Sequence, residues 1–487
     1  MWMTQRRQQL CLLLIFPAVL LLLHANPQAV EHASSKAASL AQWTRVKTMG
    51  HSEDDFASFS LVEGDDEEDE SIPIAETNLL LRPSGFTIYD RLYVWNGTIY
   101  AVTLTPESYP DLKHILSQGI SSDYGNIDPT SQEMQIITPM EAQKILGDTA
   151  VLVKGMTFIL YDSTQFMVHY YHWWGEIILG AIRTYSALSL LPGIKAPLAA
   201  PSRFLLPNVE DDTWRDYAGV DGPLMRAAFP SASIEHMGYW SDLIQLNRTF
   251  VFERAMIVSR QAAHKNPLAS LWFKMISSTM NVTAPTHFWE PLRKRVLVNT
   301  VGYLPILNDA GAVISPPKVT THPEVSRPVV LYVSRQGGGR RLLKEAHEGL
   351  VSALKELEEE GLFEVRVVRM ELLPFAKQVE EAGRAAIMVG VHGNGLTHQL
   401  WMPPSPRSTV VEIHFPKTYN HDYVMLSRNM GHKHYAVWND TTLTFPEGQW
   451  FKGVAGGRRE DAHGNSIPVH GPTVAQLIRE RLMAPIP

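Results

Sequence analysis

The sequence of 487 residues contains a single cysteine, Cys11, and this scarcity excludes several kinds of site. An internal disulfide needs two cysteines and a zinc–thiolate centre needs more than one, so neither can form within the chain. Because Cys11 lies inside an apolar run, a cysteine nucleophile is excluded as well. There is no Gly-x-Ser-x-Gly sequence, so the nucleophile elbow of α/β-hydrolases is also absent. The fold must therefore rest on its hydrophobic core.

The chain also lacks a strong excess of positive charge. It has 43 basic and 50 acidic residues, which gives a formal net charge of −7. One short acidic run, Glu63–Glu70, carries that excess, so the remainder is close to neutral. No sequence feature indicates the basic surface that nucleic-acid binding requires, and we expect no nucleic-acid partner.

The N-terminal residues have the layout of a targeting signal. Arg6 and Arg7 precede an apolar run at Leu10–Leu23, as in a signal peptide or a short membrane anchor. Because a stalk-like sequence follows, we expect a cytoplasmic tail at 1–9 and a signal anchor (or signal peptide) at 10–24. The remainder would be lumenal, in a single-pass type II protein of the Golgi or ER membrane. Four glycosylation sequons fit this location: Asn96-Gly97-Thr98, Asn247-Arg248-Thr249, Asn281-Val282-Thr283 and Asn439-Asp440-Thr441.

The rest of the chain divides by composition. Residues 25–73 read as an acidic flexible stem with too little apolar content to fold. Residues 74–312 predict an N-terminal mixed α/β domain, which opens with a hairpin at Arg91–Val102 around an Asn-Gly turn. A Pro/Thr-rich linker follows at 313–328, and the C-terminal domain spans 329–487.

The C-terminal domain has a regular alternation of apolar strands and amphipathic helices. Such alternation predicts βαβ units, right-handed crossovers and a parallel, Rossmann-like sheet with helices on both faces. The predicted strands are Val329–Ser334, Val365–Val368, Ala386–Val391, Val410–Ile413 and Tyr435–Trp438. The predicted helices are Leu343–Leu357, Phe375–Ala382, Leu396–Trp401, Tyr423–Met430 and Val474–Leu482.

Polar residues follow the first of these strands. Arg335, three glycines, Arg340 and Arg341 lead into a predicted helix. Backbone N–H groups, a helix dipole and guanidinium groups at one place would hold a diphosphate. The alternative is that these arginines coat a solvated helix start, and we expect one of the two adjacent arginines to be solvated.

A second polar loop follows the strand at Ala386–Val391. It reads His392-Gly393-Asn394-Gly395, with Thr397 close behind. Glycine permits close backbone approach, and an imidazole at a strand end can donate to a phosphate or sugar oxygen. Glu412, near the end of the next strand, resembles the acid that holds ribose hydroxyls in dinucleotide-binding folds. The alternatives are a structural Gly-x-Gly turn and an exposed acid beside a turn.

A third group lies in the N-terminal domain. If the aromatic-rich run is helical, His172 and Glu176 share one face at a spacing of four, with His169 nearby. Either Glu176 or His172 is a candidate general base. Trp173 and Trp174 are candidates for stacking on sugar rings, although buried tryptophans more often belong to a core.

These motifs, together with Phe375-Ala376-Lys377-Gln378, resemble the C-terminal half of glycosyltransferase family 61. The close similarity covers about residues 326–416, with a weaker match at 172–176. The resemblance implies transfer of xylose, arabinose or N-acetylglucosamine from a nucleotide sugar in the secretory pathway. Many members have Ala at the position of Asn394 and Asn at that of His398, so the donor sugar stays open.

The sequence gives little support for a metal site. His392, His398 and His414 lack the i, i+4 pairing of helical zinc sites. No Asp-x-Asp, the metal–diphosphate motif of the other large glycosyltransferase fold, is present. We therefore expect no metal ligands and no cofactor, with a UDP-sugar as donor substrate.

The predicted function is that of an inverting glycosyltransferase in which two Rossmann-like domains face a cleft (GT-B type). The C-terminal domain would bind the UDP-sugar, and the N-terminal domain would hold a glycan or glycoprotein acceptor. A catalytically inactive lumenal glycan-binding protein on the same scaffold is the alternative. A secreted hydrolase is a third reading, which would need two suitably spaced carboxylates or a nucleophile–base pair.

Overall fold

The computed structural model describes residues 71–315, 326–452 and 464–485. The predicted tail, the predicted anchor and nearly all of the predicted stem lie outside these residues, as do residues 316–325 of the predicted linker. Within the described part of the chain, no helix has the length and apolarity needed to cross a membrane.

The C-terminal sheet has six strands in the order β13-β12-β14-β15-β16-β17. The first five are parallel, and β17 runs antiparallel to β16. Their bounds are β12 (Val329–Val333), β13 (Glu364–Val368), β14 (Ile387–Val391), β15 (Thr409–Ile413), β16 (Lys433–Trp438) and β17 (Thr441–Leu443). Because β12 has β13 on one side and β14 on the other, the strand order reverses beside β12, where open α/β sheets bind ligands.

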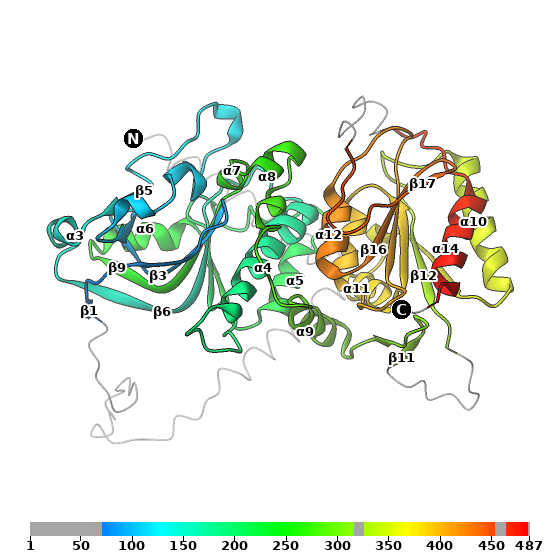
Figure 1. Cartoon of the computed structure of the whole chain (residues 1–487), viewed down its shortest axis with the longest axis horizontal. Coiled ribbons are helices and arrows are strands. Elements are labelled where there is room, and N and C mark those ends of the chain that lie inside the picture. The colour runs from blue at the N-terminus through cyan, green and yellow to red at the C-terminus, as the bar shows by residue number, and fades with distance from the viewer. Residues whose placement is uncertain (1–70, 316–325, 453–463, 486–487) are drawn as a thin grey trace, which may run out of the picture. The chain divides into compact units, whose positions relative to one another are not determined.

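Helices cover both faces of this sheet. Val330 and Tyr332 of β12 pack with α10 and α14, whereas Leu331 and Val333 pack in the cluster that contains α11 and α12 (Figure 1). A strand buried on both faces reads as a continuous apolar run, which is how it was predicted. The covering elements are α10 (Lys344–Glu359), η7 (Met370–Leu372), α11 (Phe375–Arg384), η8 (Asn394–Trp401), α12 (Asp422–Met430) and α14 (Gly471–Met483).

The N-terminal sheet is mixed. Its strands follow the order β5-β4-β3-β9-β6-β7-β8, with β1 on β6 and β2 on β3. β3 is antiparallel to β9, whereas β6, β7, β8 and β9 are mutually parallel. The bounds are β1 (Ser71–Pro73), β2 (Asn78–Leu81), β3 (Phe86–Trp95), β4 (Thr98–Val102), β5 (Met134–Ile137), β6 (Thr149–Leu160), β7 (Arg203–Leu205), β8 (Ser233–Glu235) and β9 (Phe250–Val258). This half is α/β, but its sheet is not the purely parallel sheet of a second Rossmann-like domain.

Local sequence explains several of these elements. The predicted hairpin is confirmed as β3 and β4, because Asn96 and Gly97 both adopt positive φ, as a two-residue hairpin turn requires. Helix α3 starts with a capping box between Thr138 and Glu141. The strand β1 corrects the predicted end of the stem, because Ser71–Pro73 pair with β6.

The remaining helical elements lie mainly around the N-terminal sheet (Figure 1). The α-helices are α3 (Pro139–Ile145), α4 (Leu179–Ala187), α5 (Asp221–Ala228), α6 (Met237–Gln245), α7 (Arg260–Ala263), α8 (Pro267–Trp272) and α9 (Glu290–Val301). The element η4 (Tyr171–Ile178) is a π-helix. The 3₁₀ helices are η1 (Pro106–Ser108), η2 (Leu112–His114), η3 (Ser122–Tyr124), η5 (Leu188–Leu190) and η6 (Met275–Thr279).

One hydrophobic cluster joins the two sheets. It contains Phe158 of β6, Trp174 of η4, Leu292 of α9 and Met388 of β14. In line with this shared core, the described residues form one compact unit. The predicted linker begins with β11 (Val313–Ser315), which pairs with β10 (Ile306–Leu307), so its first residues belong to a small sheet.

Candidate active site

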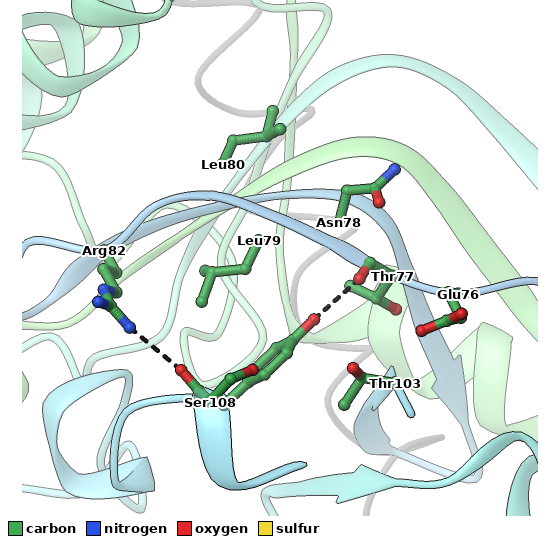
Figure 2. Close-up of a pocket in the computed structure, with 9 residues that line it drawn as sticks. Glu76, Thr77, Asn78, Leu79, Leu80, Arg82, Thr103 and Ser108 are labelled. Atoms are coloured by element: carbon green, nitrogen blue, oxygen red, sulfur yellow. Dashed lines mark hydrogen bonds between the residues drawn. The ribbon is translucent and has the colours of Figure 1, made fainter. Parts of the chain in front are cut away.

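Several cavities occur in the described part of the chain. One, of about 460 Å³, lies beside β2 (Figure 2). Its polar groups bond to one another: the Tyr109 hydroxyl donates to the Thr77 carbonyl at 2.8 Å, and Arg82 donates to the Ser108 carbonyl at 3.1 Å. It contains none of the residues that the sequence predicts to act chemically.

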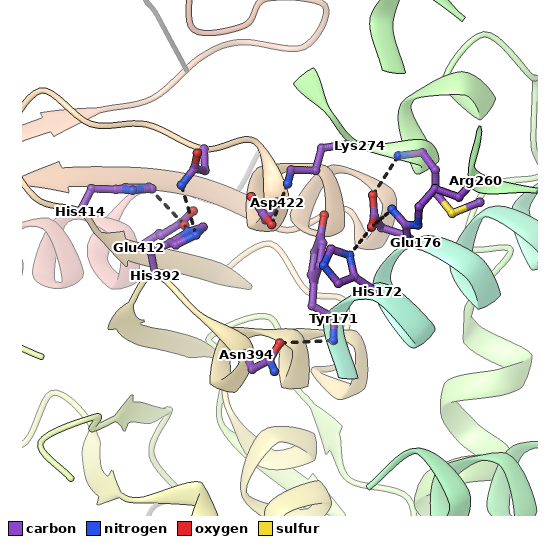
Figure 3. Close-up of polar contacts among 12 residues, drawn as sticks. Tyr171, His172, Glu176, Arg260, Lys274, His392, Asn394, Glu412, His414 and Asp422 are labelled. Carbon is purple, nitrogen blue, oxygen red and sulfur yellow. Dashed lines mark hydrogen bonds and ion pairs between the residues drawn. The ribbon is translucent and has the colours of Figure 1, made fainter. Parts of the chain in front are cut away.

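Two other cavities lie at the carboxyl ends of the parallel strands, where the predicted site residues gather. We call one of these the histidine cavity; its volume is about 600 Å³. Residues from both halves of the unit line it, and Figure 3 shows many of them. They are His169, Tyr171, His172, Lys274, Arg335, Gly339, Arg340, His392, Gly393, Asn394, Asn420, Asp422 and Tyr423.

Two arginines from the turn after β12 meet the end of β14. Arg335 and Arg340 both donate to the His392 carbonyl, at 3.1 and 2.8 Å. A Cβ on Gly393, whose φ is +146°, would lie 1.3 Å from a guanidinium nitrogen of Arg335. Glycine is therefore required here, because any side chain would displace Arg335.

Helix N-termini add positive potential to this cavity. Asn394 begins η8, and Asp422 and Tyr423 begin α12, with all three facing the cavity. Exposed N–H groups at such ends attract anions. The helix expected for this task, α10, contributes no lining residue, because Leu342 and Leu343 first run beside Ile467. The prediction that the dipole of α10 helps to bind a diphosphate is therefore wrong.

Two further predicted binding residues do not reach either cavity of this region. Arg341 donates to the Gly338 carbonyl at 3.0 Å instead of lining a cavity. The sequence predicts that one of the two adjacent arginines is solvated without indicating which, and Arg341 is half-buried. Thr397 is completely buried, so a hydroxyl contact with substrate does not fit its position. Gly395 lines only the neighbouring cavity beside Phe375, described below.

His392 forms a dyad with a buried carboxylate. Its Nδ1 donates to Glu412 at 2.5 Å, since a carboxylate can only accept (Figure 3). The other ring nitrogen, Nε2, lies 3.4 Å from the Asn420 amide. Burial lowers the pKa of His392, and the bond to Glu412 opposes this shift. The ring is therefore held in one orientation and one tautomer, with Nε2 as its second polar atom.

Glu412 does not have the position that its predicted contact with ribose requires. It has no exposed surface, and it also accepts from His434 Nε2 at 2.8 Å. His414 Nε2 lies 3.2 Å from Glu412 without hydrogen-bond alignment. Burial would raise the pKa of Glu412, but its contacts with His414, His392 and His434 hold it well below the usual value. This carboxylate orients histidines and is too deep to touch a substrate.

His392, Glu412 and His414 form a possible metal site, because their ligand atoms lie within 4.8 Å of one another. Two nitrogen or oxygen ligands of one tetrahedral zinc ion would lie roughly 3.3 Å apart. The His392–Glu412 separation is 2.5 Å, and the other Glu412 oxygen is taken by His434. These distances fit a hydrogen-bonded network better than a metal cage.

A second dyad stands on the other side of the histidine cavity. His172 and Glu176 lie in the π-helix η4, and His172 Nδ1 donates to Glu176 at 2.5 Å (Figure 3). The predicted shared face is therefore confirmed, in a helix type that often marks functional sites. His172 keeps 24% of its side chain exposed and lines the cavity.

Glu176, by contrast, is enclosed. One carboxylate oxygen accepts from Arg260 at 2.8 Å, and the other accepts from the Met275 backbone N–H at 2.8 Å. Burial would raise the pKa of Glu176, but the charge of Arg260 and the bond from His172 outweigh it and lower the pKa. Of the two predicted candidates for the base, only His172 lines the cavity, and Glu176 holds its ring in place.

Polar contacts join the two walls of the histidine cavity. Lys274 and Asp422 form an ion pair at 3.0 Å, and the Tyr171 backbone N–H donates to the Asn394 side chain at 3.3 Å (Figure 3). Sequence reasoning missed Lys274 and Asp422, and it missed Arg260. Asp422 could have been found, because it begins the helix that follows β15.

The two tryptophans belong to the core. Trp173 and Trp174 have no exposed surface; Trp173 packs on Trp214 and Trp174 on Trp401. They therefore do not form a sugar platform. His169 is exposed at the cavity rim, with its ring 5.8 Å from that of His172.

Comparison with known proteins agrees with this geometry. The family model described as Glycosyltransferase 61 matches residues 170–411, a range that begins one residue before η4 and ends in β15. The chain is also similar to the EGF domain-specific O-linked N-acetylglucosamine transferase of Drosophila melanogaster, with 30% identity over 118 residues. That match covers 24% of this chain, which spans about a fifth (21%) of the length of the relative. Through residues 170–411, the chain belongs to glycosyltransferase family 61.

Proposed function

We propose that the chain is an inverting glycosyltransferase that moves a sugar from a UDP-sugar to a hydroxyl group of a glycan or glycoprotein. One observation carries this proposal. Two arginines and two carboxylate-bound histidines, supplied by separate elements, line a single cavity at the carboxyl edge of a parallel sheet. Family membership supports the same reaction class.

The donor side of this reaction would be the end of the C-terminal sheet. Arg335 and Arg340 lie close enough to donate to one carbonyl, so their guanidinium groups concentrate positive charge beside the start of η8. A pyrophosphate bound there would be neutralised as it leaves, without a metal ion. His392 lines the same space, and its Nε2, which carries no proton while Nδ1–H is bound to Glu412, would accept a hydrogen bond from a sugar hydroxyl.

The acceptor side would be His172. The acceptor oxygen attacks the anomeric carbon while His172 Nε2 takes its proton, and the bond from that carbon to the phosphate oxygen breaks with its electron pair going to UDP. Glu176, which holds Nδ1–H, stabilises the imidazolium that forms. One attack from the side opposite to the leaving group inverts the configuration.

The cellular setting is part of the proposal. The N-terminal apolar run and the sequons are what support a lumenal enzyme held in the Golgi or ER membrane as a type II protein. Asn96, Asn247 and Asn281 are exposed, as an N-glycan requires. We further propose a GT-B-like division of labour, with the acceptor bound by the N-terminal half and the donor by the C-terminal half.

An inactive glycan-binding protein is less consistent with the site. Binding alone needs neither an oriented imidazole nor two arginines, whereas transfer needs both on the same cavity. Their convergence on the histidine cavity therefore favours transfer.

A donor screen tests the proposal. The full chain is incubated with UDP-N-acetylglucosamine, UDP-xylose, UDP-arabinose and UDP-glucose, and release of UDP is measured with and without simple glycan acceptors. UDP-N-acetylglucosamine comes first because the similar Drosophila protein is named for that sugar. We expect one donor to be consumed and its product to have the opposite anomeric configuration by NMR. A product with retained configuration would contradict the single-base mechanism.

A further inference from the structure

A second cavity adjoins the histidine cavity and has no role in the reaction steps above. We call it the Phe375 cavity; its volume is about 640 Å³. It lies at the carboxyl ends of β13, β12 and β14, and it shares Arg335 and Asn394 with the histidine cavity. The remaining lining residues are Tyr170, Tyr217–Val220, Val333, Ser334, Gly337, Gly338, Arg369–Glu371, Leu373, Phe375, Gln378, Gly395 and His398. A ligand whose pyrophosphate contacts Arg335 could therefore extend one end into each cavity.

The chemistry of the two cavities differs. The histidine cavity contains both dyad imidazoles and the Lys274–Asp422 ion pair. The Phe375 cavity contains neither dyad, and its walls are largely apolar, from Val333, Met370, Leu373 and Phe375. Apolar walls with a few polar groups suit a flat heterocyclic base better than a sugar that must react.

Gln378 supplies a polar group at this apolar wall. Its Nε2 donates to the Leu373 carbonyl at 3.0 Å, which fixes the amide in place. The amide oxygen is then oriented to accept from a ring N–H, such as that of uracil. Phe375 and Gln378 share one face of α11 at a spacing of three residues.

The fold also places an acid where a ribose would need one. In dinucleotide-binding folds, the acid that holds the ribose hydroxyls follows the Gly-rich turn, its helix and the next strand. Glu371 has this position, because it follows the glycine turn, α10 and β13 in that order. Glu412, by contrast, is completely buried.

The glycine turn after β12 lies close to Glu371 and to Arg369, which binds it. Arg369 donates to Glu371 at 2.8 Å, which leaves the second carboxylate oxygen of Glu371 for a ligand. A Cβ on Gly337 would lie 1.8 Å from the Arg369 guanidinium, so a side chain there would push Arg369 out of its present position. The acid and the glycine turn therefore form one wall of the Phe375 cavity.

We propose that the Phe375 cavity is the nucleoside subsite of the donor: Glu371 binds the ribose hydroxyls, and Phe375 with Gln378 holds the base. This inference rests on the proposed function, since it assumes a nucleotide-sugar donor. The pyrophosphate binds at Arg335, which lines both cavities, and the sugar lies in the histidine cavity. The sequence alone did not single out Glu371 as a binding residue, because its proposed role depends on the order of the strands in the sheet.

Calorimetric titration tests the subsite with UDP, 2′-deoxy-UDP and inorganic pyrophosphate on the full chain. The unaltered chain should bind UDP about 10-fold more tightly than 2′-deoxy-UDP, as expected for one hydrogen bond to a charged group. In Glu371→Ala this ratio should fall to about 1, with UDP binding weakened. If only long-range electrostatics acted, removing the negative charge of Glu371 would strengthen binding of the anionic UDP. Weaker UDP binding in Glu371→Ala therefore indicates a direct contact. Glu348→Ala, which removes an exposed acid paired with Lys344 on α10, is the matched control and should change neither value.

Phe375→Ala separates the base from the phosphates. It should weaken UDP binding about 10-fold through lost stacking, and leave pyrophosphate binding unchanged. Circular dichroism of each variant confirms that the fold is retained. An unchanged ratio of UDP to 2′-deoxy-UDP affinity in Glu371→Ala overturns the subsite while leaving the proposed function intact. Absence of UDP binding by the unaltered chain overturns both.

Discussion

Replacing Glu176 by glutamine is expected to affect stability and catalysis for two separable reasons. The carboxylate accepts from Arg260, His172 and the Met275 backbone N–H, and it has no exposed surface. One amide oxygen cannot replace two carboxylate oxygens, and the amide carries no charge. The variant therefore leaves a buried guanidinium without its counter-ion and an imidazole without its anchor.

The size of each effect follows from this geometry. The Arg260 side chain is only 5% exposed, so loss of its partner should lower the free energy of unfolding by about 3–5 kcal/mol. General base catalysis is typically worth about 10²- to 10⁴-fold, so kcat should fall by at least about 10². Guanidinium denaturation and saturation kinetics, both at pH 7, measure the two quantities. The pKa of Glu176 is lowered on folding, so the stabilisation is complete at this pH and is lost only in strong acid.

A double variant separates the two effects. Adding Arg260→Met to Glu176→Gln removes the unpaired charge, so most of the stability should return while kcat stays low. Asp90→Asn is the matched control, because it breaks a quarter-exposed pair with Arg254 on the N-terminal sheet. It should cost about 1 kcal/mol and leave kcat unchanged. Recovery of the original kcat in the double variant would refute the role of Glu176 in orienting His172.

Three further predictions concern the same cavity. Arg335→Ala should lower transfer about 10²- to 10³-fold with native circular dichroism, because neutralising the leaving group is worth about 3–4 kcal/mol of barrier, and His392→Ala should also lower it, because a contact with the donor is lost; normal turnover in both variants would remove the proposed site. The pKa of His172 is lowered from 6.5 by burial, and a base must be neutral, so the rate should hold down to pH 6.5 and fall as the pH drops through that lower pKa; loss of rate already above pH 7 would point to another base. Activity should survive EDTA, and loss with recovery on Mn²⁺ would contradict the metal-free mechanism.

The C-terminal fold was predictable because its strands are buried on both faces. Strands such as β12 and β14 therefore appear as short continuous apolar runs, and α10 has apolar residues at helical spacing. The short antiparallel β17 was missed, since three residues carry no periodic signal. The N-terminal sheet was not predictable, because β6 pairs with β9 about a hundred residues along the chain, as at Val151 and Phe250.

The site was predictable where a strand end carries it. Arg335 and His392 were found by that rule, and they line one cavity. Glu412 was misassigned because it precedes the last residue of β15 and shares its face with Val410, so its side chain points into the core that carries α12. Arg260 and Lys274 come from segments without any motif, and only the tertiary fold brings them to the dyads.

The central claim is that Arg335 and the neighbouring main-chain N–H groups bind the pyrophosphate of a nucleotide sugar. Titration of UDP and uridine into the unaltered chain and into Arg335→Ala tests it most directly. The account predicts that the variant loses at least about 10-fold in affinity for UDP and less than about 2-fold for uridine. Equal affinity of both proteins for UDP would contradict it.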